Sequence, residues 1–370
     1  MAMEQVGVKR IMRRWVVVFL WGVGCLMLAG VGSCRRTDVV WIYTSLPKET
    51  LSGLATVLEK KLPAGTELQW VQGGSETLAM KLNLDWNSGK NRADLLMASD
   101  PWLYQDLKRE GRLLVYRSPA AQGVPAEFTD PDGMYSAFRL SWLVLAYHPQ
   151  FVGSQEIPSQ WKDLLLPKWK QKVSMPSPFD SPAGFAWVGL MSGNYGWSFF
   201  KQLKGNGLVA EGTSSSVVGR IETGERPIGV GLYESFLKAR ERKIPLRFSF
   251  PTDGTILIPG GIALLSESPQ KEKAQRVYDA LFSPEVQEFM NREGMISPLT
   301  LPSSEGRDSK EPLKDLAKAW VKDLPKEQKE ALVFIHDKKG PNLWSRQELS
   351  RMEKSREQIR ALFSDIIYHE

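Results

Sequence analysis

The amino-acid sequence predicts an α/β protein of two lobes, each a mainly parallel sheet flanked by helices, with a helical C-terminal extension. Three observations support this. Along the first part of the chain, β-branched apolar segments alternate with segments of helical periodicity. Residues 135–147 and 246–265 are apolar, extended stretches suited to leaving one lobe and returning to it. Beyond residue 270 the pattern is helical only. Two crossings imply a cleft between the lobes.

Length and composition limit the function. The 370 residues, 42% hydrophobic and 24% charged, exclude a disordered chain, a fibre and a polytopic membrane protein. Both cysteines, Cys25 and Cys34, lie in the first tenth of the chain, which leaves the body without a disulfide framework or thiolate metal site. The three histidines are scattered, which argues against zinc and against a histidine-based triad. We expect no metal, no cofactor and no enzymatic activity.

The N-terminal segment has the pattern of a secretory signal peptide. Four basic residues between positions 9 and 14 precede an apolar run over 15–31 and the small residues 32 and 33. We expect residues 1–33 to be a signal peptide. Residues 31–34, Val-Gly-Ser-Cys, resemble a bacterial lipobox, which implies an acylated Cys34 and a periplasmic or cell-surface lipoprotein. The alternative is an uncleaved membrane-spanning helix, because the run is near the lower length limit for a bilayer.

The charge distribution argues against a nucleic-acid partner. Half of the net charge of +6 lies in residues 1–33, which hold four basic residues and one acid. The rest of the chain contains no cluster of Lys and Arg interleaved with aromatic residues. We expect a monomer that binds no nucleic acid.

The first lobe is predicted over residues 38–148. Residues 39–43 and 66–71 have the pattern of strands, and residues 93–98 form a third apolar run. Helices are predicted after Pro47, from Ser75 and from Asp100 to Gly111. The crossing strand over 135–147 ends this part.

The second lobe is predicted over residues 149–246, with short strands at 173–175 and 227–232. Residues 247–300 return to the first lobe and end in helices, one of them restarting at Ser283-Pro284. Residues 301–370 are predicted to be a helical extension that packs on the first lobe. Its last element opens with a capping box at Ser345 and carries an apolar stripe from Leu349 to Ile366.

Seven stretches of the chain carry a family resemblance: residues 40–49, 73–82, 93–96, 178–184, 221–231, 250–255 and 279–287. In order and spacing they resemble the ferric-iron, phosphonate and sugar-phosphate branch of the solute-binding proteins of ABC importers. Together they cover roughly residues 38–300. The resemblance implies a type II periplasmic-binding-protein fold that closes about one solute and delivers it to a membrane permease.

Helix starts at the carboxyl ends of parallel strands suit an anion. They expose N–H groups without carbonyl partners, at the positive end of the helix dipole. In the first lobe, Ser45 follows the first strand and can offer a hydroxyl and a backbone N–H, or act only as an N-cap. Gly74 and Ser75 follow the second strand, where glycine lets a ligand approach the backbone. The alternative there is a plain tight turn.

In the second lobe, the equivalent candidates are Ser181, within Ser-Pro-Ala-Gly, and the pair Ser214 and Ser215 ahead of a helix. A solvated serine run is the alternative for the pair. Arg139, on the crossing strand, is a possible charge partner for the ligand or a hinge salt bridge.

Tyr233 is a candidate ligand-binding residue because it lies where iron-binding relatives carry paired tyrosines. The next residue here is Glu234, and the histidine that supports iron in those relatives is missing. Ferric iron prefers several anionic oxygens, so a phosphate- or phosphonate-containing solute fits better, with iron as the alternative. Asp94 and Asp253 are expected to orient a strand end and a turn, and not to form a catalytic pair.

The predicted function is therefore the extracytoplasmic solute-binding component of an ABC importer for a small anionic solute. A ligand sensor that docks on a membrane histidine kinase would use the same fold. An extracytoplasmic hydrolase would need an activated nucleophile, which the sequence does not offer.

Overall fold

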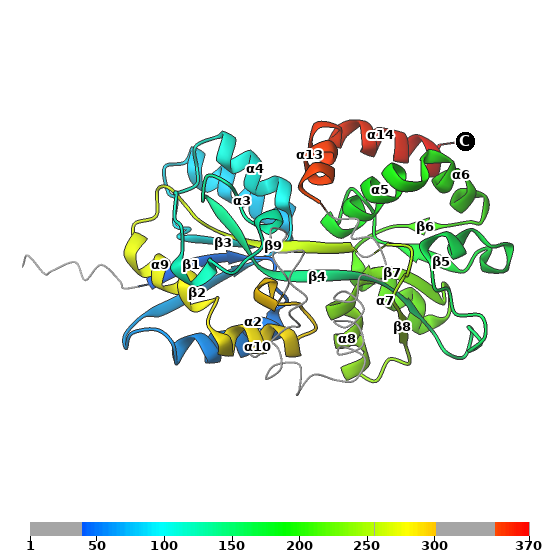
Figure 1. Cartoon of the computed structure of the whole chain (residues 1–370), viewed down its shortest axis with the longest axis horizontal. Helices are drawn as coiled ribbons and strands as arrows, with labels where there is room; N and C mark the ends of the chain where they lie inside the picture. The colour runs from blue at the N-terminus through cyan, green and yellow to red at the C-terminus, as the bar shows by residue number, and fades with distance from the viewer. Residues whose placement is uncertain (1–38, 255, 301–344, 370) are drawn as a thin grey trace, which may run out of the picture. The chain divides into compact units, whose positions relative to one another are not determined.

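The computed structural model describes residues 39–254, 256–300 and 345–369 (Figure 1). The predicted signal peptide, the predicted acylation site Cys34 and most of the predicted C-terminal extension, residues 301–344, lie outside the described residues. Within the described residues, none of the helices has the length and apolar character needed to cross a membrane.

The first lobe is a parallel sheet in which β1 pairs with β2 on one side and β3 on the other. Its first strand forms because its β-branched and aromatic residues alternate between the two faces of the sheet. Helix α2 follows and buries Leu51, Leu54 and Leu58 on one face, as the sequence predicts. The elements are β1 (Val39–Thr44), α2 (Lys48–Glu59), β2 (Glu67–Gln72), α3 (Ser75–Asn87), β3 (Leu95–Ala98) and α4 (Pro101–Arg109).

The second lobe repeats this arrangement with β5 between β6 and β7, all parallel. Its core is aromatic: Trp187 meets Phe200 edge to face at 5.6 Å, a geometry that favours the ring quadrupoles. The elements are β5 (Val173–Met175), α5 (Pro182–Tyr195), α6 (Trp197–Gly205), β6 (Val209–Ala210), α7 (Ser214–Thr223), β7 (Ile228–Leu232) and α8 (Tyr233–Glu241).

Two antiparallel strands run between the lobes, β4 (Tyr135–Tyr147) and β9 (Ile256–Leu264) (Figure 1). β4 pairs with β9 along its first part, up to Leu143, and its end pairs with β7 and with β8 (Arg247–Ser249). A bulge lies between Ala137 and Arg139. The described strands thus form one nine-stranded sheet, in the order β2-β1-β3-β9-β4-β7-β5-β6 with β8 on β4. The predicted crossing strand over residues 135–147 is confirmed.

In the described residues after β9 the elements are helices, as predicted. Helix α9 (Lys271–Ala280) packs on β9, and α10 (Pro284–Arg292) packs on α2 of the first lobe. Short 3₁₀ helices occur at η1 (Pro119–Ala121), η2 (Ala126–Phe128), η3 (Trp161–Leu165), η4 (Pro167–Trp169) and η5 (Pro298–Thr300).

The described part of the C-terminal extension corrects one expectation. Helices α13 (Arg346–Lys354) and α14 (Arg356–Ile367) were expected on the first lobe. α14 packs on α5 and α6 of the second lobe, and the two helices reach α4 of the first lobe through ion pairs. The reason is complementarity: the buried stripe of Met352, Ile359 and Phe363 meets the aromatic surface of α5 and α6. Half of the predicted capping box forms, with the Ser345 hydroxyl accepting from the Glu348 N–H at 3.1 Å.

Candidate functional site

A cavity of about 220 Å³ lies where helices of both lobes begin. Six of the seven predicted ligand-binding residues line it, and the seventh, Tyr233, does not. Because the carboxyl ends of β1, β2, β3, β5 and β7 point to the same region, the turns that follow these strands converge. The predicted residues at the cavity are Ser45, Gly74, Ser75, Ser181, Ser214 and Ser215.

The start of α3 lies at this cavity, where the Glu76 carboxylate accepts from its own backbone N–H. The Gly73 N–H is already used, because it donates to the Thr44 carbonyl at 3.1 Å. Gly74 is the N-cap residue and has no capping side chain, so the first-turn N–H groups of α3 lack carbonyl partners within the helix. A Cβ built on Gly74 would meet only a Glu76 carboxylate oxygen, at 3.9 Å. Space beside this backbone is therefore open to a ligand.

The start of α5 is held more tightly. The Ser181 hydroxyl accepts from the Gly184 N–H at 3.4 Å and so caps the helix. A Cβ on Gly184 would stand 2.5 Å from the Pro176 carbonyl oxygen, so only glycine permits this packing. The hydrogen of the Ser181 hydroxyl remains available to a ligand oxygen.

The start of α7 is closed by a capping box between Thr213 and Ser216. Ser214 is buried and Ser215 is exposed, and both line the cavity. Their position argues against a merely solvated serine run.

Ser45 lines the cavity, but of its two predicted donors only the hydroxyl can reach a ligand. Its backbone N–H donates to the Met97 carbonyl at 2.9 Å and cannot serve a ligand, because β1 and β3 pair up to that point. Its hydroxyl accepts from the Ser99 N–H at 3.1 Å and lies 3.3 Å from the Ser99 hydroxyl. Whichever of the two hydroxyls donates to the other, one hydroxyl hydrogen of the pair remains for the ligand.

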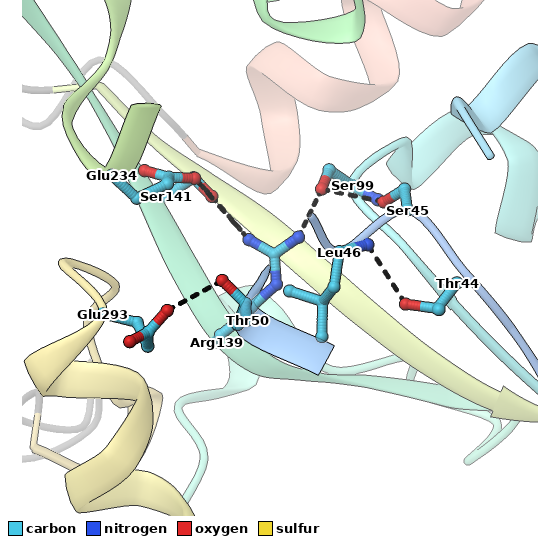
Figure 2. Close-up of polar contacts among 9 residues, drawn as sticks. All are labelled: Thr44, Ser45, Leu46, Thr50, Ser99, Arg139, Ser141, Glu234 and Glu293. Atoms are coloured by element: carbon cyan, nitrogen blue, oxygen red, sulfur yellow. Dashed lines mark hydrogen bonds and ion pairs between the residues drawn. The ribbon is translucent and has the colours of Figure 1, made fainter. Parts of the chain in front are cut away.

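Arg139 lines the cavity, and its polar contacts are drawn in Figure 2. Its guanidinium donates to the Ser99 hydroxyl and to the Ser141 hydroxyl, both at 2.6 Å. The Ser141 hydroxyl in turn donates to Glu234 at 2.5 Å. Since Arg139 lies on β4 and Glu234 in the first turn of α8, this chain of bonds links Ser99 of the first lobe to the second lobe.

The sequence carried a signal for this arrangement. A Cβ on Gly260 would lie 2.7 to 2.9 Å from the Arg139 side chain. Glycine on the paired strand β9 therefore makes room for the guanidinium.

Arg139 and Glu234 form a buried pair of opposite charges, 3.8 Å apart and 3% and 6% exposed. Burial raises the pKa of Glu234, and the positive charge of Arg139 opposes that rise. Burial likewise lowers the pKa of Arg139, and Glu234 opposes the change. Among the described residues, the second Glu234 carboxylate oxygen, Oε2, has no hydrogen-bond partner. Each charge therefore depends on the other for its stability in the interior.

Two further carboxylates line the cavity, Glu76 and Asp180. Burial is the main cause that raises the pKa of Glu76. With Arg139 as the one lysine or arginine among the described lining residues, the side chains of the cavity are net acidic. The backbone N–H groups of the helix starts favour an anion, so the cavity offers places for both signs of charge.

Tyr233 faces the core, away from the cavity. Its ring packs against Phe248 at 4.8 Å and Phe250 at 5.8 Å, and its side chain is 2% exposed. The rotation of α8 turns the Tyr233 ring to the core, whereas the next two residues, Glu234 and Ser235, both line the cavity.

The two aspartates considered for catalysis have structural partners. Asp94 accepts from the Trp41 N–H at 2.8 Å and the Ser268 hydroxyl at 2.5 Å. Asp253 accepts from the Trp161 N–H and the Tyr195 hydroxyl, each at 2.8 Å. In the described part of the chain, no group of three or more His, Cys, Asp or Glu residues is placed to hold a metal ion.

The family of bacterial extracellular solute-binding proteins matches residues 90–344, more than half of the chain. The chain belongs to this family. A periplasmic protein of Salmonella paratyphi A named for binding 2-aminoethylphosphonate is 23% identical over 233 residues, 60% of this chain and 66% of that protein. The ABC transporter periplasmic-binding protein y4fP of Sinorhizobium fredii is 23% identical over 235 residues, 61% of this chain and 65% of its own. The matches thus span about two thirds of these relatives.

Solved structures agree on the two-lobed fold. AfuA of Actinobacillus pleuropneumoniae, solved with fructose-6-phosphate, aligns with a TM-score of 0.64 and 21% identity over 90% of this chain and 99% of its own. Iron-bound HitA of Pseudomonas aeruginosa aligns with a TM-score of 0.62 and 18% identity, over 81% and 98% of the two chains. The fold is that of a two-lobed periplasmic binding protein, as the sequence predicts. Membership of a family of binding proteins agrees with the expectation that the chain is not an enzyme.

Proposed function

We propose that this protein is the extracytoplasmic solute-binding component of an ABC importer and that it closes about a small solute carrying a phosphate or phosphonate group. The observation that carries the proposal is the convergence of the α3, α5 and α7 starts, from both lobes, on one cavity. Amide and hydroxyl donors of this kind satisfy phosphate oxygens without a cationic side chain.

The acidic side chains of the cavity limit which solutes are suitable. Glu76, Asp180 and Glu234 would repel a purely anionic solute, but they can accept hydrogen bonds from an ammonium group. A solute with an anionic head and an amine at its other end meets both requirements. 2-Aminoethylphosphonate, for which several relatives are named, is such a solute.

Ferric iron is the second candidate, and one observation weighs against it. The phenol ring that would bind iron belongs to Tyr233, which packs between Phe248 and Phe250 in the core. Iron would then have only carboxylates and serine hydroxyls of the cavity as side-chain ligands.

A thermal-shift experiment with matched solutes tests the proposal, because a ligand that binds only the folded protein raises the melting temperature. 2-Aminoethylphosphonate should give the largest shift. Ethylphosphonate lacks the amine and ethanolamine lacks the phosphonate, so each should give a smaller shift or none. A shift with ferric citrate alone, accompanied by a visible absorption band, would replace this proposal with iron binding.

The proposed partners are an ABC permease and, through Cys34, the membrane. The lipobox-like residues 31–34 support acylation of Cys34. Mass spectrometry of the N-terminus from cells expressing the parent chain and the Cys34→Ser variant should find a lipid only on the parent. The sensor alternative would require binding to a histidine kinase instead of stimulation of transport, so reconstitution with each partner separates the two functions.

A further inference from the structure

The described C-terminal helices touch both lobes, but in different ways. We propose that residues 345–369, which we call the C-terminal latch, remain packed on the second lobe as the lobes move. Ion pairs between the latch and α4 of the first lobe then stabilise the closed arrangement of the two lobes. The proposal rests on the hinge closure proposed above. In Figure 1, α13 lies between α4 and α5.

The contacts with the second lobe are mainly apolar and closely packed. Phe363 is fully buried and meets Phe200 edge to face at 5.4 Å. Met352 fills the space beside Gly189, where an added Cβ would stand 2.2 Å from the methionine sulfur. The Arg351 guanidinium donates to the Gly189 carbonyl at 2.7 Å. Close packing of this kind is costly to undo, so the latch should move with the second lobe.

The contacts with the first lobe are polar. Arg356 pairs with Asp106 at 3.0 Å, and Glu353 pairs with Arg109 at 3.1 Å. A cavity of about 470 Å³ separates α13 from α4, lined by Tyr104 and Lys108 on one side and Leu349 and Ser350 on the other. Partly exposed ion pairs across a gap can break and re-form at small cost. This face is therefore suited to separate when the lobes open.

The latch also lies near the solute cavity. The Arg360 guanidinium lies over the Phe185 ring, 5.2 Å from its centre, in the first turn of α5. The Tyr368 ring is 6.3 Å from Phe179, which precedes the cavity residues Asp180 and Ser181. The positive charge of Arg360 acts on the cavity residue Glu76, where it opposes the rise in pKa caused mainly by burial.

Such a latch would change the affinity for the solute by changing how much of the unliganded protein is closed. If solute binds the closed state, the apparent affinity scales with the fraction of protein that is already closed. Loss of two partly exposed ion pairs should weaken solute binding by about two- to tenfold. The solute need not touch the latch for this effect.

The test measures closure without any solute. Dyes are attached to the full chain at Glu59→Cys in the first lobe and Glu222→Cys in the second, both exposed positions, with Cys25→Ser and Cys34→Ser as background. Energy transfer between the dyes reports the separation of the lobes. The Glu353→Ala, Arg356→Ala double variant should lower the transfer. The matched control is Glu285→Ala, which removes an exposed ion pair to Lys61 within the first lobe and should leave the transfer unchanged.

Two further results decide the mechanism. The charge swap of Asp106→Arg with Arg356→Asp should restore most of the transfer lost in Arg356→Asp alone, which a merely unfolded helix would not do. High salt should lower the transfer of the parent towards that of the double variant, because ion pairs are screened. Equal transfer in parent and double variant, with normal circular dichroism, would overturn the latch. Since no solute is present, failure of the solute assignment would leave this result intact.

Discussion

The helix starts that meet at the cavity differ between the lobes. In the first lobe, α3 begins after Gly74 and has no capping side chain. In the second lobe, α5 and α7 begin at Ser181 and Thr213, whose hydroxyls cap them. A capped start has already used a backbone donor, whereas an uncapped start keeps its donors for a ligand. For the anionic solute proposed above, we therefore expect backbone donors mainly from the first lobe and hydroxyl groups from the second.

The largest expected effect is on the free energy of unfolding and comes from Arg139, whose hydrogen bonds connect the first lobe to the second. Arg139→Met should lower the free energy of unfolding by about 3–5 kcal/mol, because Glu234 is left buried without its counter-charge. Urea unfolding of the unliganded protein measures this. Arg139→Met combined with Glu234→Gln should recover most of the loss. If the double variant is as unstable as the single one, the charge pair is not the cause.

The second-largest effect is expected from a substitution that gives α3 a capping side chain, as α5 and α7 already have. Gly74→Asp places a carboxylate at the start of α3, where it can cap the helix and occupy the place of the solute anion. We expect solute affinity to fall by two orders of magnitude or more, with the free energy of unfolding unchanged or slightly raised.

Isothermal titration measures the affinity of Gly74→Asp, and thermal melting its stability. Ser52→Asp, on the exposed face of α2, is the control for added charge in the first lobe. A Gly74→Asp variant that binds as tightly as the parent would remove α3 from the site.

A smaller effect on stability distinguishes a serine that caps a helix from a serine that only lines the cavity. Ser181→Ala should lower the free energy of unfolding by about 0.5–2 kcal/mol, because α5 loses its cap. Ser75→Ala removes a first-turn hydroxyl that caps nothing and should leave unfolding nearly unchanged. Both should weaken solute binding. Equal stability of the two variants in chemical unfolding would contradict the assignment of Ser181 as a cap.

The smallest effect depends on pH. Burial raises the pKa of Glu76 in the folded protein above its ordinary value of 4.5. The unfolded chain therefore loses its proton first as the pH rises, which destabilises the folded protein above the ordinary pKa. Glu76→Gln should be more stable than the parent at neutral pH, with the difference vanishing below about pH 4. Melting temperatures across pH 3–8 measure it, and a difference that grows towards low pH would contradict the assignment.

Much of the fold could be predicted because its signals are local. The strand at residues 135–147 is a continuous apolar run, and the strands at 173–175 and 228–232 lie within or at the predicted bounds. The packing of the C-terminal helices could not be predicted this way. An apolar stripe indicates that one face of a helix is buried. The surface that buries it is the aromatic surface of α5 and α6, which exists only in the folded protein.

For the site, turns after strands were enough to select six residues that the fold brings together. Three aspects depended on the three-dimensional structure. The rotation of α8 decides that Glu234 and not Tyr233 faces the cavity. The pairing of β1 with β3 decides that the Ser45 N–H is already bonded. Arg139 was recognisable as a charged residue on a crossing strand, but its link to Ser99 depends on contacts far apart in the sequence.

The bulge between Ala137 and Arg139 interrupts the ladder of β4 next to the residue that joins the lobes. A strand with regular pairing resists twisting, and a bulge is where its backbone most readily changes direction. Rotation of one half of the molecule against the other should therefore concentrate at this point of β4. Amide hydrogen exchange there should slow when solute binds, while amides near the middle of β1 and β7 exchange at the same rate in both forms.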